Sequence, residues 1–125
     1  MNDLTFEQDG IKQVEVDELK ALLEKKSDIV FIDVRELDEY DQGHIPGIPL
    51  IPMNTIPQFA NEMDKEQTYL FICRSGGRSQ NVSLYMKEQG FQHVMNYSGG
   101  MLAWTGDVQT GPEWIVKDSK ELKQK

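Results

Sequence analysis

The fold is decided by the stretch Tyr69-Leu70-Phe71-Ile72-Cys73-Arg74-Ser75-Gly76-Gly77-Arg78-Ser79. Its first four residues are apolar, which favours a buried strand. The residues that follow are small or cationic, which is typical of a tight loop. Apolar residues then recur at helical spacing, at Val82, Tyr85 and Met86. The stretch therefore predicts a strand, a loop and a helix in that order.

Cys73 is the only cysteine, and it stands where the predicted strand meets the loop. Gly76 and Gly77 allow the backbone to curl, so that several N–H groups can point inward. The following helix adds a partial positive charge at its N-terminus, and Arg74 and Arg78 add full charges. These features favour a thiolate with an anion bound beside it, so we predict that Cys73 is an activated nucleophile. The sequence leaves open which arginine faces the anion. The alternative is a buried structural cysteine.

Three further motifs accompany this loop in a fixed order. They are Ile32-Asp33-Val34-Arg35-Glu36, Gly43-His44-Ile45-Pro46-Gly47 and Gly99-Gly100-Met101-Leu102-Ala103-Trp104. Together with Cys73 to Ser79, the ordered set resembles the signatures of single-domain rhodaneses, the thiosulfate sulfurtransferases. The resemblance covers about residues 11–108 and implies the fold of that family. That fold is α/β, with a five-stranded parallel sheet and helices on both faces.

The pattern of the chain also indicates a single α/β domain, as its 125 residues suggest. Helical patterns alternate with short apolar segments, which implies a parallel sheet covered on both faces. The predicted strands are 11–14, 29–34, 50–51, 69–72 and 93–97. We expect a loose tail over residues 1–10, the domain over 11–108, and an extension over 109–125. Trp114 in this extension has no predicted place.

The resemblance implies that sulfur is transferred through Cys73. Its thiolate would attack the outer sulfur of a donor such as thiosulfate, sulfite would leave, and Cys73 would hold a persulfide. A thiol, cyanide or a sulfur-carrier protein would then accept the sulfur. The residues expected to bind the small anionic donor are those of the loop, Arg74, Ser75, Gly76, Gly77 and Arg78.

Polar residues outside the loop allow two interpretations each. Asp33 and Arg35 could support the active loop from behind, or they could cap a strand and stabilise the fold. Arg35 and Glu39 are four residues apart, so we favour a structural ion pair for them and leave Asp33 open. A general base at His44 is conceivable, because histidine side chains in general titrate near neutrality, but its glycine and proline neighbours favour a structural turn. One cysteine and two isolated histidines make no typical zinc site, so we expect no metal or cofactor.

Composition limits the partners and the location. The net charge of −8 disfavours nucleic acids and anionic membranes as partners. The longest apolar runs are too short to span a bilayer, and Met1-Asn2-Asp3-Leu4 lacks the pattern of a signal peptide. A single cysteine allows no internal disulfide, which suits a reducing compartment. We therefore expect a cytoplasmic monomer.

Two other functions share part of this pattern. A cysteine phosphatase or arsenate reductase also holds a thiolate in a cradle, but phosphatases place five residues between the cysteine and the arginine that clamps phosphate. Here four residues separate Cys73 from Arg78, and Ser79 holds the phosphatase position. The shorter loop should suit one sulfur atom better than three phosphoryl oxygens. A non-catalytic rhodanese-like docking module would not need Cys73 or its cationic loop.

Overall fold

A computed structural model of the chain describes residues 6–25 and 28–123. Its centre is a five-stranded sheet in the order β1-β2-β5-β4-β3. The strands are β1 (Phe6–Gln8), β2 (Ile11–Val14), β3 (Ile29–Asp33), β4 (Thr68–Ile72) and β5 (Val94–Tyr97). The strand that leads to Cys73 is therefore an interior strand, bonded on both sides.

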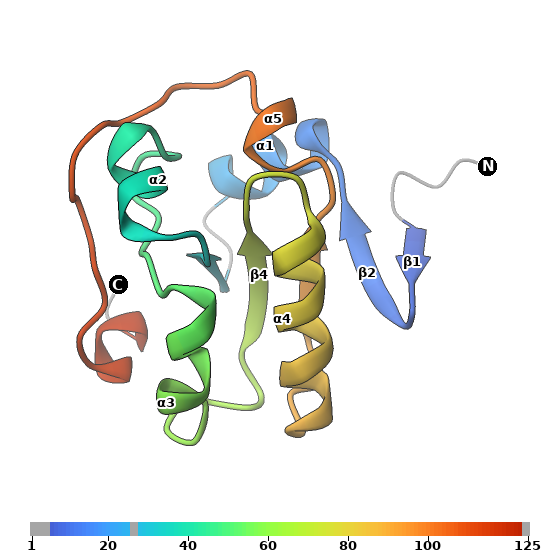
Figure 1. Cartoon of the computed structure of the whole chain (residues 1–125). Helices are drawn as coiled ribbons and strands as arrows, with labels where there is room; N and C mark the ends of the chain where they lie inside the picture. The colour runs from blue at the N-terminus through green and yellow to red at the C-terminus, as the bar shows by residue number, and fades with distance from the viewer. Residues whose placement is uncertain (1–5, 26–27, 124–125) are drawn as a thin grey trace.

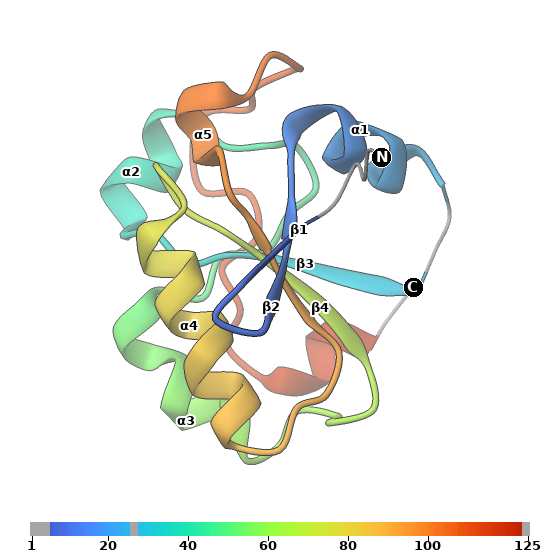
Figure 2. The same cartoon turned by 90° about the vertical axis from the view of Figure 1, so that its right-hand side faces the viewer.

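Helices cover both faces of this sheet, as Figures 1 and 2 show for α4 on one face and α1 on the other. The α-helices are α1 (Val16–Glu24), α2 (Leu37–Gln42), α3 (Ile56–Ala60), α4 (Gly77–Glu88) and α5 (Gly100–Ala103), and the 3-10 helices are η1 (Met53–Thr55) and η2 (Ser119–Lys123). None of the helices in the described part of the chain has the length and apolarity that a membrane crossing requires.

The apolar side chains of β4 alternate between two separate clusters. Tyr69 and Phe71 pack with the residues of α3 and α4, whereas Leu70 and Ile72 pack with those of α1. This alternation follows from the two-residue period of a strand. Because both faces of β4 are buried, its carboxyl end and Cys73 are held firmly at the sheet edge that α2 and α5 also approach (Figure 1).

The sheet differs from the sequence prediction in one pairing and one strand. The prediction of a purely parallel sheet is wrong, because β1 pairs with β2 in antiparallel orientation across a turn at Asp9 and Gly10. The strand predicted at Leu50-Ile51 is also wrong, since Leu50 makes only isolated bridges to Asp33 and Ile115. The prolines on either side of Leu50-Ile51 lack the N–H groups that a longer ladder needs.

The N-terminal segment is more ordered than the sequence predicts. The loose tail expected over residues 1–10 is wrong for residues 6–8, which form β1, and residues 1–5 lie outside the described residues. An edge strand pairs through its backbone on one side only, so it needs little apolar patterning. Because Glu7 and Gln8 are polar, the hydrophobic pattern of the sequence did not predict β1.

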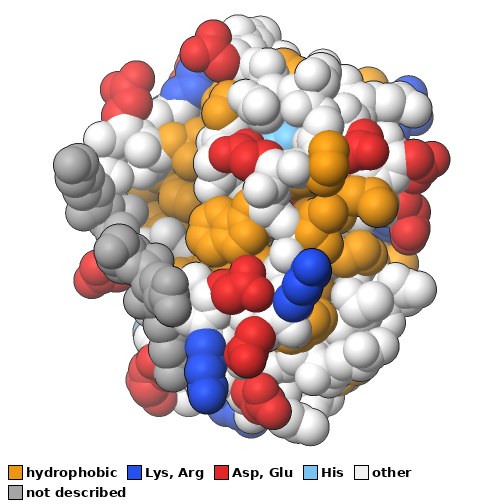
Figure 3. All heavy atoms as spheres, turned by 90° about the vertical axis from the view of Figure 1, so that its left-hand side faces the viewer, with side chains coloured by type: hydrophobic (Ala, Val, Ile, Leu, Met, Phe, Trp, Pro, Cys, Tyr) orange, Lys and Arg blue, Asp and Glu red, His pale blue; other side chains and the backbone are white. Residues whose placement is uncertain are grey.

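The C-terminal segment returns to the domain and pairs with Leu50. The Leu50 N–H donates to the Trp114 carbonyl at 2.8 Å, and the Val116 N–H donates to the Leu50 carbonyl at 3.1 Å. The Trp114 ring packs against the core cluster of α3 and α4, and its Nε1–H donates to Glu121 at 3.0 Å. Apolar side chains gather on the face of the molecule seen in Figure 3. The division of the chain at residue 108 stays a prediction.

Replacing Trp114 tests whether this segment stabilises the domain. Because the half-buried ring contacts the core, Trp114→Ala should lower the free energy of unfolding by about 2 kcal/mol, measured by urea denaturation. Leu102→Ala is the control, since Leu102 is 65% exposed and its removal should change stability by less than about 0.5 kcal/mol. A stability for Trp114→Ala equal to that of the control would show that the segment does not support the core.

Candidate active site

The loop after β4 forms a cradle around the sulfur of Cys73. The Cys73 Sγ accepts a hydrogen bond from the Gly76 N–H at 3.1 Å and one from the Ser79 N–H at 3.4 Å. The Ser79 Oγ lies 3.3 Å from the same sulfur. Cys73 is fully buried. The N-terminus of α4 therefore meets the sulfur, where its partial positive charge favours an anion.

Two glycines permit the close approach between this loop and the segment that begins α5. Gly76 has φ +94°, and a Cβ there would lie 2.2 Å from the Ser98 carbonyl oxygen. Gly100 has φ +63°, and a Cβ there would lie 2.3 Å from the Arg74 carbonyl oxygen. Both positions need the left-handed conformation and a close backbone approach, so a larger residue fits neither.

The first turn of α5 holds the loop from outside. The Met101 N–H donates to the Cys73 carbonyl at 2.9 Å, and the Leu102 N–H donates to the Arg74 carbonyl at 3.0 Å. The first N–H groups of a helix have no partner within it, so they are available for these bonds. The Cys73 and Arg74 carbonyls therefore point outward and bond to α5. The Gly76 and Ser79 N–H groups point inward and face the sulfur.

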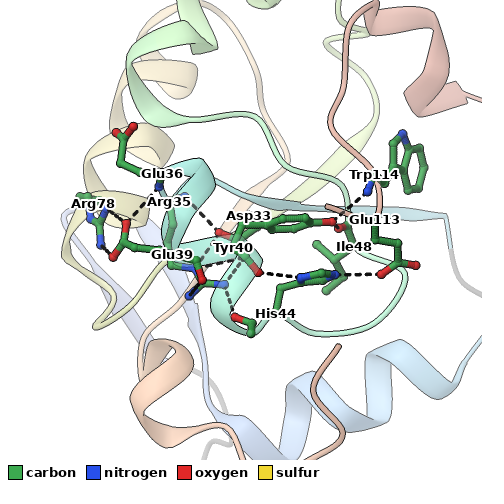
Figure 4. Close-up of polar contacts among 11 residues, drawn as sticks. Asp33, Arg35, Glu36, Glu39, Tyr40, His44, Ile48, Arg78, Glu113 and Trp114 are labelled. Carbon is green, nitrogen blue, oxygen red and sulfur yellow. Dashed lines mark hydrogen bonds and ion pairs between the residues drawn. The ribbon is translucent and has the colours of Figure 1, made fainter. Parts of the chain in front are cut away.

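The two arginines of the loop have different surroundings. Arg78 makes a bidentate ion pair with Glu39 of α2, with Nη1 to Oε1 at 2.8 Å and Nη2 to Oε2 at 2.9 Å (Figure 4). The hydrogen bonds from Arg78 lower the pKa of Glu39 to about 2. Arg74 is exposed, and it makes no ion pair with any residue that the structure describes. Arg74 lines a hollow of about 240 Å³ beside the loop.

Asp33 and Arg35 form a buried ion pair at the end of β3 (Figure 4). The Arg35 Nη2 donates to Asp33 Oδ2 at 2.9 Å and to the Gly43 carbonyl at 2.8 Å. Arg35 reaches Glu39 only through its main-chain carbonyl, at 3.4 Å. The ion pair expected between Arg35 and Glu39 is therefore wrong, because the Glu39 carboxylate turns to Arg78. Arg35 thus bonds the main chain at Glu39 and Gly43, and Glu39 holds Arg78 of the active loop. These contacts would let Asp33 and Arg35 support the loop from behind, and that role stays a prediction.

His44 lies away from the cradle and is fully buried. Its ring stacks on Tyr40 with 3.7 Å between the ring centroids. Its Nδ1 lies 2.9 Å from the Tyr40 carbonyl oxygen and its Nε2 lies 2.9 Å from the Glu113 carboxylate (Figure 4). Burial raises the pKa of Glu113, but the hydrogen bonds from His44 and the Gly47 N–H outweigh it and hold the pKa below its usual value. Both ring nitrogens have structural partners, which agrees with the structural role expected for His44.

A row of buried polar side chains lies behind the loop and was not expected from the sequence. Ser79 Oγ donates to Asn96 Oδ1, and Asn96 Nδ2 donates to Gln13 Oε1 at 2.9 Å. Gln13 Nε2 in turn donates to Gln80 Oε1 at 2.8 Å. A signal was present for Asn96, which interrupts the otherwise apolar β5, where an unpartnered polar group would be costly. Gln13 gave no such signal, because Lys12 beside it already makes β2 half polar.

Comparisons with known proteins agree on one family. Residues 15–107 match the model of the rhodanese-like domain. YtwF of Bacillus subtilis (strain 168), which carries a provisional sulfurtransferase name, is 44% identical over 99 residues, 79% of this chain and 95% of YtwF. Thiosulfate sulfurtransferase GlpE of Pseudoalteromonas translucida is 34% identical over 95 residues, 76% of this chain and 90% of GlpE. The crystal structure of a rhodanese-like domain protein from Staphylococcus aureus has a TM-score of 0.71 and 35% identity, with 78% of this chain and 96% of that chain covered.

Replacing Gly100 tests whether α5 holds the loop. Gly100→Ala would bring a Cβ to 2.3 Å from the Arg74 carbonyl, so it should shift the NMR amide signals of Gly76 and Ser79. Gly47→Ala is the matched control, because Gly47 also has a positive φ (+82°) but nothing within 4 Å of an added Cβ. Gly47→Ala should lose about 1–2 kcal/mol of stability to backbone strain and leave the loop signals in place, whereas Gly100→Ala should lose more because of its added clash. Unmoved loop signals in Gly100→Ala would show that the loop does not depend on α5.

Proposed function

Because this chain belongs to the rhodanese-like family, we propose that it is a sulfurtransferase that carries sulfane sulfur as a persulfide on Cys73. The observation that carries the proposal is the Cys73 Sγ, which accepts main-chain hydrogen bonds from Gly76 and Ser79 at the N-terminus of α4. Such donors stabilise a sulfur anion. A cysteine that only filled space in the core would need none of them.

The proposed reaction has two displacement steps. The Cys73 thiolate attacks the outer sulfur of thiosulfate, a bond forms between the two sulfur atoms, and sulfite leaves with the electron pair of the broken bond. An acceptor then attacks the outer sulfur of the persulfide, and Cys73 leaves as a thiolate. The acceptor is cyanide in an assay and a thiol or sulfur-carrier protein in a cell. Two successive displacements of this kind give ping-pong kinetics.

Arg74 is the cation best placed to recruit the anionic donor. Its side chain is exposed beside the loop, whereas both terminal nitrogens of Arg78 are engaged by Glu39. Cys73 has no exposed surface, so a donor bound near Arg74 reaches the sulfur only when the loop opens. The other loop residues expected to bind substrate, Ser75, Gly76 and Gly77, contribute through their backbone in this proposal.

The choice of sulfur over phosphate, the acceptor protein, the location and the oligomeric state also belong to this proposal. The loop contains four residues between Cys73 and Arg78, so we rank phosphate chemistry below sulfur transfer. The acceptor protein, the cytoplasmic location and the monomeric state stay predictions.

The covalent step can be tested by weighing the intact protein. Because Cys73 is the only thiol, thiosulfate should add the mass of one sulfur atom, and cyanide should remove it. Cys73→Ser should show neither change and no turnover. Retained turnover in Cys73→Ser would refute the assignment. Hydrolysis of p-nitrophenyl phosphate that depends on Cys73, without any gain of sulfur, would favour the phosphatase instead.

The roles of the two arginines can be separated by kinetics. Arg74→Ala should raise the KM for thiosulfate about tenfold, because a hydrogen bond to a charged group is lost. Arg78→Ala, the matched control, should change the KM less but should lower stability, since it leaves Glu39 without its partner. A larger KM effect in Arg78→Ala than in Arg74→Ala would reverse this assignment.

A further inference from the structure

The geometry behind the loop leads us to infer that Asn96 directs the hydroxyl proton of Ser79 away from Cys73 and thereby limits how far the site stabilises a thiolate. Asn96 is a positioning residue in this inference, since it acts on Cys73 only through Ser79. The inference deepens the sulfurtransferase function proposed above and rests on it for its importance. The titration that tests it does not require sulfur transfer.

Ser79 stands between two groups that can accept its single proton. Its Oγ lies 3.3 Å from Cys73 Sγ on one side and within hydrogen-bond distance of Asn96 Oδ1 on the other. Ser79 is fully buried, and Asn96 is 2% exposed. The hydroxyl has one proton, so it cannot donate to both acceptors at once. The Asn96 oxygen lies much closer to Ser79 Oγ than the sulfur does, so it takes the proton.

The orientation of the Asn96 amide is fixed by its own donors. Nδ2 donates to Gln13 Oε1 at 2.9 Å and to the Gly76 carbonyl at 3.2 Å. If the amide were turned over, three oxygens would face one another without a proton between them. Asn96 therefore presents an oxygen to Ser79, and an amide oxygen can only accept.

The orientation of Gln13 is fixed in the same way. Its Nε2 donates to the Ile11 carbonyl at 3.0 Å and to Gln80 Oε1 at 2.8 Å. The Gln80 Nε2 donates to the Gln8 carbonyl of β1 at 2.9 Å. Because main-chain carbonyls can only accept, all the side-chain amides of the row point the same way. An acceptor is left at the end that meets Ser79.

The fixed orientation of the Asn96 amide changes what the Ser79 hydroxyl can offer to the Cys73 sulfur. While Asn96 holds the Ser79 proton, the Ser79 oxygen can accept from a Cys73 thiol but gives nothing to a thiolate. Turning the hydroxyl toward a thiolate would leave the buried Asn96 Oδ1 without a donor, which is unfavourable. The thiolate then depends on main-chain N–H groups. A thiolate that is less stabilised is the stronger nucleophile, so Asn96 favours reactivity over thiolate population.

The test is a pH titration of the thiolate, followed by its ultraviolet absorbance with Cys73→Ser as the blank. Asn96→Leu keeps the branching and the number of side-chain heavy atoms but removes the acceptor, so the Ser79 hydroxyl should turn to the sulfur. The midpoint of the titration should fall by about one pH unit. In a Ser79→Ala background the same Asn96→Leu change should leave the midpoint in place, because the hydroxyl that carries the effect is absent.

Two further variants separate this role from a structural one. Ser83→Ala removes a buried hydroxyl that donates to the Ser79 carbonyl at 2.8 Å, and it should leave the midpoint unchanged. Asn96→Ala should lower the midpoint as Asn96→Leu does, and it serves if the leucine variant does not fold by circular dichroism. An unchanged or raised midpoint, or the same shift in the Ser79→Ala background, would overturn the inference. A lowered midpoint in a protein that never gains sulfur from thiosulfate would count against the proposed function alone.

Discussion

The site depends on two main-chain hydrogen bonds that join the start of α5 to the loop after β4. The N–H groups of Met101 and Leu102 engage the carbonyls of Cys73 and Arg74, and this contact is close enough that Gly76 and Gly100 have no room for a side chain. With its carbonyls held from outside, the loop can turn N–H groups toward the sulfur. The chemistry proposed for Cys73 follows from this backbone arrangement more than from any charged side chain.

Charged residues determine what surrounds the cradle. Arg35, paired with Asp33, bonds the Gly43 carbonyl at the end of α2, and Glu39 on that helix then holds Arg78. One loop arginine thus becomes part of the frame, while Arg74 stays exposed beside the hollow near α5. In a protein with a net charge of −8, a single exposed cation at the site gives anions a local point of attraction.

Local signals in the sequence predicted the centre of the molecule well. The strand, loop and helix around Cys73 each depend on neighbouring residues, and the structure confirms all three. Features that depend on pairing with another segment of the chain, adjacent or distant, were missed. Phe6–Gln8 is a strand only because β2 lies beside it, and Leu50 is bridged instead of forming a strand. The partners Arg78 and Glu39 are 39 residues apart, and Gln13 and Asn96 are 83 residues apart, so neither contact could be predicted without the fold.

The most direct test of the account is a high-resolution crystal structure of the protein after treatment with thiosulfate. We expect a second sulfur atom on Cys73, placed within hydrogen-bond distance of loop N–H groups, with the Met101 N–H still bonded to the Cys73 carbonyl. A second sulfur that points away from every loop N–H, or a loop released from α5, would contradict the claim that this backbone cradle holds the transferred sulfur.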